Sequence, residues 1–559
     1  MRREVSVVNK KVCSFPILFA LLALLIGTCA VVFPASAQAA PTSTGSITVS
    51  GTVASSYDAY QIFSANVVDG DSDAKIATDL TWASDAARDA VLPVLHSAGM
   101  PNSQTTAQEA AEWLNTDSHL TSALSAQLAR SLQNSGAVSV ALNAGTEAKL
   151  PCGYWLIVAD DDAIAQNEAG TAPIMALVGG SAVTVKPKAA TPKVSKHVLE
   201  DSTDAWQKAA DATVADDLYW RLSATVPAGL TAYDTYTVQF VDTMSAGLDP
   251  SKVASSMRVY VAAGADGGFD AVQTGKDGRA GAEPAKGWTD ITAQCATKVA
   301  ADGKTFTVRT GDLIAALGGA DAFTAGARVV AVYNAPLNSA CNHGIAKGNH
   351  NEVYLRYPRS PFADQSGDAG FTRTPSDDAC AYTWDLALTK RGSDGDKPLA
   401  GAVLSIADDR GRTLAADGTW DAEGKATVTT GEDGRVTVSG MDSGKLEVRE
   451  LKAPKGYTAF EGTRSVTVKA EGLDVDQVAA AKPKLTITAE SPLRADSADG
   501  STGSLEASLI NTPANVPPRG FMPSTGDMAM YAAAAAAVAG AALIVVALLV
   551  KRGGGSHKE

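Results

Sequence analysis

The middle of the chain contains the stretch Leu218-Tyr219-Trp220-Arg221-Leu222-Ser223-Ala224-Thr225-Val226. Apolar side chains occupy every second position of this stretch. Successive side chains of a β-strand point to opposite faces, so this period predicts a strand with one apolar face. Similar segments follow at residues 236–240 and 353–357, and residues 262–287 between them are typical of a long surface loop. Strands separated by turn residues in this way predict a β-sandwich.

The regions on either side also contain strand-like segments. Residues 46–50, 57–63 and 154–158 are rich in β-branched and aromatic side chains, as are 384–390 and 399–404 with their alternating apolar positions. Before residue 154, an Ala-rich segment repeats leucine every four positions, which predicts a helix with one apolar face: Leu120, Leu124, Leu128 and Leu132. We therefore expect a mainly β fold of tandem immunoglobulin-like sandwiches, with a helical insert in the first.

The N-terminal end has the composition of an export signal. Basic side chains within residues 2–11 precede an apolar run at 12–33, and the small residues at 35–39 suit signal peptidase. An uncleaved signal anchor is the alternative, but Pro34 and the small residues favour cleavage. We expect a signal peptide at residues 1–39.

The C-terminal end has the composition of a membrane span. Residues 528–550 carry no charged side chain, and a helix of that length, at ~1.5 Å per residue, crosses a hydrocarbon core of ~30 Å. Lys551 and Arg552 follow it, and basic residues stay on the cytoplasmic side. The sequence thus predicts a transmembrane helix with a cytoplasmic tail at 551–559, and residues 40–527 outside the cell.

Composition narrows the range of functions. Charged residues make up 19% of the chain, and the net charge of −14 is spread along it without a basic block, which argues against nucleic-acid binding. The chain contains no His-Glu-x-x-His, no Gly-x-Ser-x-Gly and no phosphate-binding glycine loop. We therefore expect neither an enzyme that turns over nor a cofactor.

Four cysteines lie outside the signal peptide, in an exterior where disulfides persist: Cys152, Cys295, Cys341 and Cys380. They are disulfide candidates, and three sets of pairs are open. Cys341 lies near His343 and His350, but no further Cys or His pair completes a zinc site, so we expect no metal.

The residues just before the apolar C-terminal run carry a motif: Met522-Pro523-Ser524-Thr525-Gly526. It resembles the Leu-Pro-x-Thr-Gly sorting signal of sortase substrates in Gram-positive bacteria, with Met in the Leu place. The resemblance implies that a sortase cleaves between Thr525 and Gly526 and passes the Thr525 acyl group to an amine. It also implies that the membrane holds only the precursor, and that the product is anchored to peptidoglycan in the cell wall.

Residues 446–457 are similar to the E-box of a collagen-adhesin B-type (CnaB) module, on the spacing of Glu450, Ala453, Pro454, Gly456 and Tyr457.

Two further regions resemble the other domains of fimbrial backbone subunits. Residues 57–63 and 153–157 are similar to the N-terminal domain, and residues 193–198, Trp206 and 240–248 to the middle domain. Together the motifs resemble those of a sortase-dependent pilus backbone subunit.

The resemblance implies an intramolecular isopeptide bond in the last module, from Lys390 to Asn511 with help from Glu450. A lysine in an apolar core loses its proton more readily, which makes its amine a nucleophile. The alternative is a solvated Lys390 and a surface Glu450.

In the middle region, Lys196 and Asp242 match the family's amine and carboxylate. The segment that should carry the asparagine, residues 357–361, reads Tyr-Pro-Arg-Ser-Pro and lacks it. Because this segment lacks the family's asparagine, an isopeptide bond from Lys196 is in doubt.

Two outcomes are open there. Asn349 or Asn351 substitutes from a shifted register, or the bond is absent and a disulfide such as Cys341 to Cys380 braces the region. The missing asparagine favours absence, which would leave the lysine and the aspartate as an ion pair.

The family's acceptor lysine lies between the first two domains, where this chain has Val185-Lys186-Pro187-Lys188. Lys188 is the first candidate and Lys186 the second, and an ordinary linker is the alternative. With such an acceptor, the chain is a pilus shaft subunit whose partners are sortase, identical pilin subunits and peptidoglycan, with accessory pilins and a host surface ligand as further candidates. Without one, it is a monomeric wall-anchored adhesin or a tip or basal pilin.

The expected domain organisation is a signal peptide at 1–39, an N-terminal domain at 40–187, a middle sandwich at 188–376, a CnaB-like domain at 377–514, a linker with the sorting motif at 515–527, a transmembrane helix at 528–550 and a basic tail at 551–559.

Overall fold

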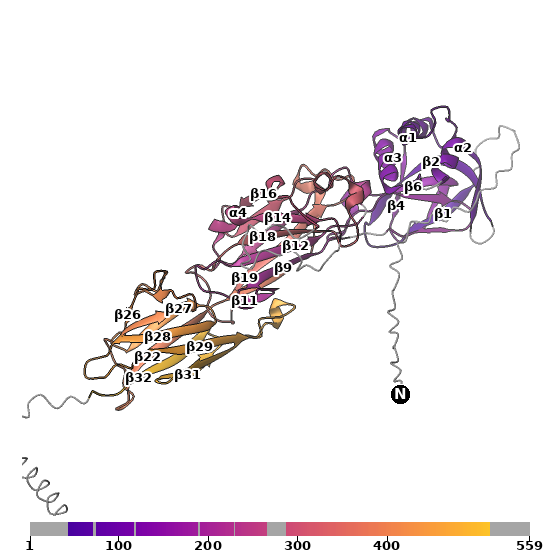
Figure 1. Ribbon diagram of the computed structural model, residues 1–559. Helices are drawn as coiled ribbons and strands as arrows, with labels where there is room; N and C mark the ends of the chain where they lie inside the picture. Colours follow the sequence, from indigo (N-terminus) through magenta and orange to yellow (C-terminus); the bar gives the residue numbers. More distant parts are fainter. Residues whose placement is uncertain are drawn as a thin grey trace, which may run out of the picture.

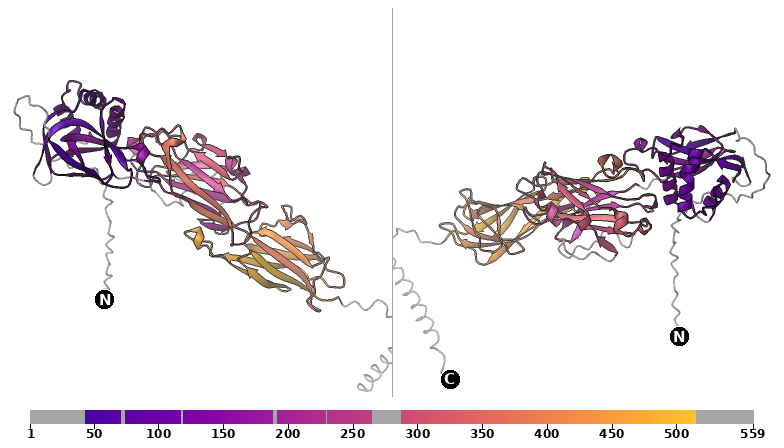
Figure 2. Two further views of the ribbon diagram at one scale, coloured as in Figure 1. Left: turned by 180° about the vertical axis from the view of Figure 1, so that it is seen from behind. Right: turned by 90° about the horizontal axis from the view of Figure 1, so that it is seen from above.

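The computed structural model describes residues 43–70, 74–116, 119–187, 191–228, 230–264 and 287–514. The expected signal peptide, Lys188, the sorting motif and the apolar C-terminal run lie outside these residues. Within the described ranges, no helix is long and apolar enough to cross a membrane. Three β-rich bodies follow one another in a row (Figure 1), and they stay in line in the other two views (Figure 2).

The first body contains a three-stranded sheet, β5-β1-β8, and a second sheet, β3-β2-β6-β7, with β4 added to β2. The strands are β1 (Thr44–Val49), β2 (Ser56–Asp69), β3 (Lys75–Trp82), β4 (Ser139–Asn143), β5 (Ala148–Pro151), β6 (Gly153–Ala159), β7 (Ile174–Val178) and β8 (Val183–Val185).

Three helices form the expected insert between β3 and β4: α1 (Asp85–Ser97), α2 (Ala107–Asn115) and α3 (Ser122–Asn134). Each helix begins after a residue whose side chain accepts from a backbone N–H of the first turn, and α2 has a full capping box of Thr106 and Glu109. Three of the four leucines of the predicted stripe lie on α3, where Leu124, Leu128 and Leu132 are buried against β2 and β6 residues. The prediction was wrong for Leu120, which is only partly buried and precedes the helix because α3 begins after its N-cap, Thr121.

The middle body is a sandwich of two sheets, ordered β10-β9-β12-β18-β14-β15 and β11-β21-β19-β13-β17-β16, with β20 on β19. The strands are β9 (Val194–Glu200), β10 (Ala205–Gln207), β11 (Ala209–Asp211), β12 (Tyr219–Thr225), β13 (Gln239–Met244), β14 (Arg258–Ala262), β15 (Trp288–Asp290), β16 (Ala296–Val299), β17 (Thr305–Arg309), β18 (Arg328–Asn334), β19 (Asn349–Pro358), β20 (Phe371–Arg373) and β21 (Asp377–Tyr382). Two short helices, α4 (Val253–Ser256) and α5 (Leu313–Ala316), lie in its connections.

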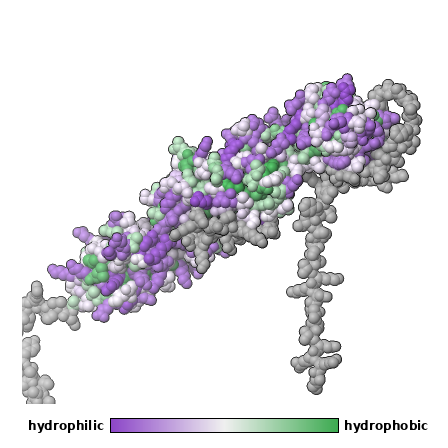
Figure 3. All heavy atoms as spheres, turned by 45° about the horizontal axis from the view of Figure 1, so that its top comes forward, coloured by the Kyte–Doolittle hydropathy of each residue, from purple (hydrophilic) through white to green (hydrophobic). Residues whose placement is uncertain are grey.

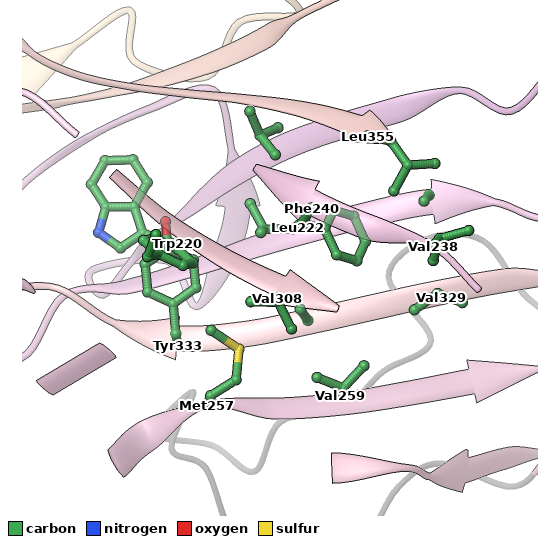
Figure 4. Close-up of a cluster of buried hydrophobic side chains, with 14 of the residues drawn as sticks. Trp220, Leu222, Val238, Phe240, Met257, Val259, Val308, Val329, Tyr333 and Leu355 are labelled. Atoms are coloured by element: carbon green, nitrogen blue, oxygen red, sulfur yellow. The ribbon is translucent and has the colours of Figure 1, made fainter. Parts of the chain in front are cut away.

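Strand β12 lies within the alternating stretch at residues 218–226. Its apolar row, Trp220, Leu222 and Ala224, is fully buried in the core between the two sheets, where Trp220 and Tyr333 are register neighbours (Figure 4). The opposite row is buried as well, because Tyr219 packs with Val330 and Val332 in a smaller cluster on the outer face. The alternation therefore marks the strand correctly, although both of its faces are covered.

The last body is a sandwich of the sheets β27-β22-β32-β31 and β25-β24-β23-β28-β29-β30, with β26 on β23. The strands are β22 (Trp384–Gly392), β23 (Val403–Ala407), β24 (Thr413–Leu414), β25 (Trp420–Asp421), β26 (Val428–Thr429), β27 (Arg435–Met441), β28 (Gly444–Lys452), β29 (Thr463–Glu471), β30 (Lys484–Ala489), β31 (Leu493–Asp499) and β32 (Ser504–Asn511). The first strand, β22, pairs in parallel with the last, β32.

The mainly β fold of tandem sandwiches with a helical insert is confirmed. One strand lies on the other side of the expected boundary at residue 376, because β21 pairs with β19 and so belongs to the middle body. The face seen in Figure 3 is largely hydrophilic, with smaller apolar patches.

Candidate functional site

The last body contains a buried lysine that contacts two polar side chains. Lys390 lies on β22, Asn511 ends the neighbouring β32, and Glu450 faces them from β28 of the opposite sheet. Lys390 Nζ contacts Asn511 Oδ1 and lies 3.3 Å from Glu450 Oε1. Asn511 Nδ2 donates to both Glu450 oxygens, at 2.9 and 3.0 Å. The structure thus brings together the three residues that the sequence singled out.

Burial sets the chemistry of this site. The side chains of Lys390 and Glu450 are fully buried, and Asn511 is 2% exposed. Loss of hydration lowers the pKa of Lys390 from 10.5 to about 8, although the nearby Glu450 carboxylate opposes the shift. The uncharged fraction of the amine near neutral pH is therefore larger than that of an ordinary lysine, although the protonated form still predominates. An uncharged amine in contact with a carboxamide, itself hydrogen-bonded to a carboxyl group, has the arrangement needed for amide exchange.

A second buried lysine lies in the core of the middle body. Lys196 on β9 contacts Asp242 Oδ2 on β13 of the facing sheet, and its Nζ donates to the hydroxyl of Tyr333 on β18 at 2.9 Å. That hydroxyl donates to Asp242 Oδ2 at 3.1 Å. All three residues are 0% exposed. Burial lowers the pKa of Lys196 to about 8 and raises the pKa of Asp242, because each group loses hydration.

The two asparagines left open by the sequence lie in different places. Asn351 on β19 is fully buried in the same cluster, and its Nδ2 donates to the Tyr333 hydroxyl at 2.8 Å. Asn349 points elsewhere, since its Nδ2 donates to the carbonyl oxygens of Asn342 and Ala381. Of the two, only Asn351 is placed with Lys196 and Asp242.

Sequence reasoning missed Tyr333. It lies in the strand Arg328–Asn334, where every neighbour from Val329 to Val332 is apolar and fully buried. A tyrosine hydroxyl in such a strand requires a partner, and this was the available signal. Its partners come from three other strands, so the sequence alone could not name them.

The disulfide candidates are not paired. Cys152, Cys295, Cys341 and Cys380 are all free thiols in the structure. The suggested pair of Cys341 and Cys380 is therefore corrected: the Cys341 sulfur faces His343 at 3.6 Å, whereas the Cys380 thiol is directed to the Ala381 carbonyl. Burial raises the pKa of Cys295 to about 11 and also raises the pKa of Cys341.

The candidate acceptor segment is only partly described. Lys186 is exposed and directly follows β8, whose last residue, Val185, accepts a hydrogen bond from Ser50 N at 2.8 Å. Lys188 and the sorting motif lie outside the described residues. Among the residues that are described, no group of His, Cys, Asp and Glu side chains has the arrangement of a metal site.

The last body resembles a known family of domains. Residues 385–482 match the family model described as SpaA, a prealbumin-like fold domain. Over these residues the last body is similar to a SpaA domain, and it is called the SpaA domain below. The match covers Lys390 and Glu450, and β32 with Asn511 completes the sheet of this SpaA domain.

Sequence similarity extends to a streptococcal surface protein. The chain is 29% identical over 143 residues to the trypsin-resistant surface T6 protein of Streptococcus pyogenes serotype M6, and the match covers 24% of each chain. It therefore spans about a quarter of that relative's length.

Solved structures of pilins are also similar. The T6 backbone pilin of Streptococcus pyogenes serotype M6 is 16% identical, with a TM-score of 0.46, and the full-length major pilin SpaD of Corynebacterium diphtheriae is 15% identical, with a TM-score of 0.41. Each alignment covers 84% of this chain and 98% of the pilin. The SpaA match and the similarity to the T6 surface protein support the resemblance to Gram-positive backbone pilins that the sequence motifs indicated.

Proposed function

We propose that this chain is a structural subunit of a surface pilus, held together by covalent bonds that it forms within itself and by bonds that a sortase forms between copies. It acts as a building element rather than as an enzyme with turnover. The observation that carries the proposal is the buried Lys390, Asn511 and Glu450 cluster between the first and last strands of the SpaA domain.

The reaction at this cluster is an exchange of one amide for another. Lys390 Nζ attacks Asn511 Cγ, a new Cγ–Nζ bond forms and the Cγ–Nδ2 bond breaks. Glu450 accepts a proton from Nζ and passes it to Nδ2, which leaves as ammonia. The two hydrogen bonds from Nδ2 to Glu450 support this assignment, because they place the proton carrier at the leaving nitrogen.

The middle body supports a second bond of the same kind, from Lys196 to Asn351. The facing Asp242 takes the place that Glu450 has in the SpaA domain. Lys196 and Asn351 come from opposite sheets, so this amide would tie the two layers of the sandwich across their core.

Polymerisation would join the C-terminal sorting motif of one copy to a lysine between the first two bodies of the next copy. We propose that a sortase cleaves after Thr525, within Met522 to Gly526, and transfers the acyl group to Lys188, with Lys186 as the second choice, or to a peptidoglycan amine. The exposed position of Lys186 directly after β8 supports an accessible acceptor segment. The pilus would then be displayed on the Gram-positive cell wall, with the membrane holding only the precursor.

Intact and peptide mass spectrometry tests the internal bonds. Each bond lowers the mass by one ammonia, so the processed chain should be lighter by two. Peptides joined through Lys390 and Asn511, and through Lys196 and Asn351, should be recovered. A mass without any loss would refute the internal bonds.

Acceptor variants in the native host separate the shaft subunit from a monomeric adhesin or an accessory pilin. Lys188→Ala, alone and combined with Lys186→Ala, should abolish the high-mass ladder of a shaft subunit. Lys193→Ala, an exposed lysine in the same linker region, is the matched control and should keep it. A ladder that survives the double variant would favour the adhesin or accessory role.

A further inference from the structure

The asparagine amide has different hydrogen-bond partners in the site of Lys390 and in the site of Lys196. In the SpaA domain, the Asn511 amide donates directly to both carboxylate oxygens of Glu450. In the middle body, the Asn351 amide donates instead to the hydroxyl of Tyr333, which in turn donates to the carboxylate of Asp242. A phenol therefore stands between the carboxylate and the leaving nitrogen.

The phenol oxygen of Tyr333 meets both reacting groups. It receives a hydrogen bond from Lys196 Nζ at 2.9 Å and one from Asn351 Nδ2 at 2.8 Å. Within the described residues, the buried Asn351 Oδ1 accepts no hydrogen bond, so none has to break when the amine approaches this carbonyl group. The one hydroxyl thus touches the nucleophile, the leaving group and the carboxylate.

The surrounding core fixes the orientation of this ring. Tyr333 is 0% exposed, and Phe306 packs edge-on against it with ring centroids 4.8 Å apart. Lys196 Nζ lies 5.4 Å from the Tyr333 ring centroid and 5.6 Å from that of Trp220. A hydroxyl on so constrained a ring has few alternative partners, which favours a fixed proton path.

We propose that Tyr333 is a catalytic residue of the middle body, where its hydroxyl relays the proton that converts the Asn351 amide nitrogen into leaving ammonia. The inference rests on the proposed Lys196 to Asn351 bond. As Nζ attacks Cγ, Asp242 takes a proton from Nζ. The Tyr333 hydroxyl gives its proton to Nδ2 as the Cγ–Nδ2 bond breaks, and Asp242 returns the proton it took to the phenol oxygen. One amide forms, one ammonia leaves, and both Tyr333 and Asp242 regain their starting state.

The test is Tyr333→Phe in the full chain, followed by proteolysis and mass spectrometry of the joined peptides. We expect the fraction joined through Lys196 and Asn351 to fall at least about tenfold at a fixed time, because general acid–base groups commonly contribute 10²-fold or more. The Lys390 to Asn511 bond of the same molecules is the internal control and should be complete. Tyr357→Phe, an equally buried tyrosine on β19, is the matched control and should leave both bonds intact.

The outcomes separate the relay from the function on which it rests. A wild-type chain joined at Lys196, with Tyr333→Phe joined equally fast, overturns the relay and leaves the proposed function standing. A wild-type chain that is not joined at Lys196 refutes the second bond and the relay together.

A second variant covers the case in which Tyr333→Phe fails to fold. Incorporation of 3-fluorotyrosine at position 333 keeps the ring shape and the hydroxyl but makes the phenol more acidic. A relay predicts a changed time course of joining in the freshly folded chain, by about twofold or more. A hydroxyl with only a structural role predicts an unchanged time course, and that result would overturn the relay.

Discussion

Trp384 Nε1 donates a hydrogen bond of 2.6 Å to Asp211 Oδ2, and this contact crosses from the SpaA domain to the middle body. Both residues are buried, and the same oxygen accepts from the backbone of Ser443 at 2.9 Å. Exposed ion pairs such as Arg410 with Asp201 surround this contact. Exposed pairs contribute little to stability, so the joint between the two bodies is expected to depend on this buried hydrogen bond and on the largely buried pair of Arg412 with Asp216.

Replacement of Trp384 by Phe should weaken this joint. The change leaves the buried Asp211 carboxylate with one donor fewer, which costs about 1–3 kcal/mol. Urea unfolding of residues 43–514 should show an earlier transition. Trp113→Phe is the control, because Trp113 is half-buried on α2 of the first body, which is not part of this joint. An equal decrease of the urea midpoint in the two variants would contradict the role of the Trp384 hydrogen bond in the joint.

Glu200 should make stability depend on pH. Burial, with a smaller contribution from the neighbouring Asp211 charge, raises the pKa of Glu200 from 4.5 to about 7. The folded state thus binds the proton more tightly than the unfolded state, so the contribution of Glu200 to stability is fully present below pH 4.5 and is lost as the pH rises to about 7. At about 1.4 kcal/mol per pKa unit, the loss is roughly 3 kcal/mol.

Thermal unfolding between pH 4.5 and 8 measures this effect. Glu200→Gln should flatten the decline, whereas Glu352→Gln, an exposed glutamate of the same body, should not. Asp442, whose pKa burial also raises, will add a decline of the same sign in both variants. A melting temperature of Glu200→Gln that falls with pH as steeply as that of the wild type would contradict the role of Glu200.

Glu450→Gln should leave the SpaA domain folded but without its internal bond. After correction for the substitution, the mass of the variant chain should exceed that of the wild-type chain by the mass of one ammonia. Closing a loop on the order of 100 residues contributes roughly 4–5 kcal/mol, so the melting temperature should fall markedly. Glu447→Gln, an exposed neighbour on the same strand, should retain both the bond and the stability. Full bond formation in Glu450→Gln would exclude the carboxyl group from the reaction.

The four cysteines should remain thiols after export. Under denaturing conditions without reductant, all four in residues 43–514 should react with an alkylating reagent. In the native state, reaction should be slow, because the thiols are buried or half-buried and the pKa of Cys295 is about 11. Fewer than four alkylated sites in the denatured chain would reveal a disulfide.

The sequence predicted features that depend on local pattern. Alternation marked β12 and the leucine spacing marked α3, because each signal is contained in one segment. The resemblance to a CnaB module, and not a local pattern, grouped Glu450 with Lys390 and Asn511.

Features that depend on the register of several strands escaped prediction. Asn351 lies in the cluster of Lys196 and Asp242 only because β13 pairs with β19. Tyr333 contacts all three side chains only because β18 lies beside β12 in the facing sheet. Cysteine pairing failed for the same reason, since a composition that suits disulfides does not set the distance between two sulfur atoms.

The parallel pairing of β22 with β32 determines how the SpaA domain would bear tension. A pull along the chain enters at the start of β22 and leaves after Asn511, so the strands are loaded in shear and their ladder of hydrogen bonds shares the force. With the proposed amide in place, the force passes from the backbone at Lys390 through its side chain to Asn511. Residues 391–510 then carry no tension, and the domain transmits force as a link of fixed length.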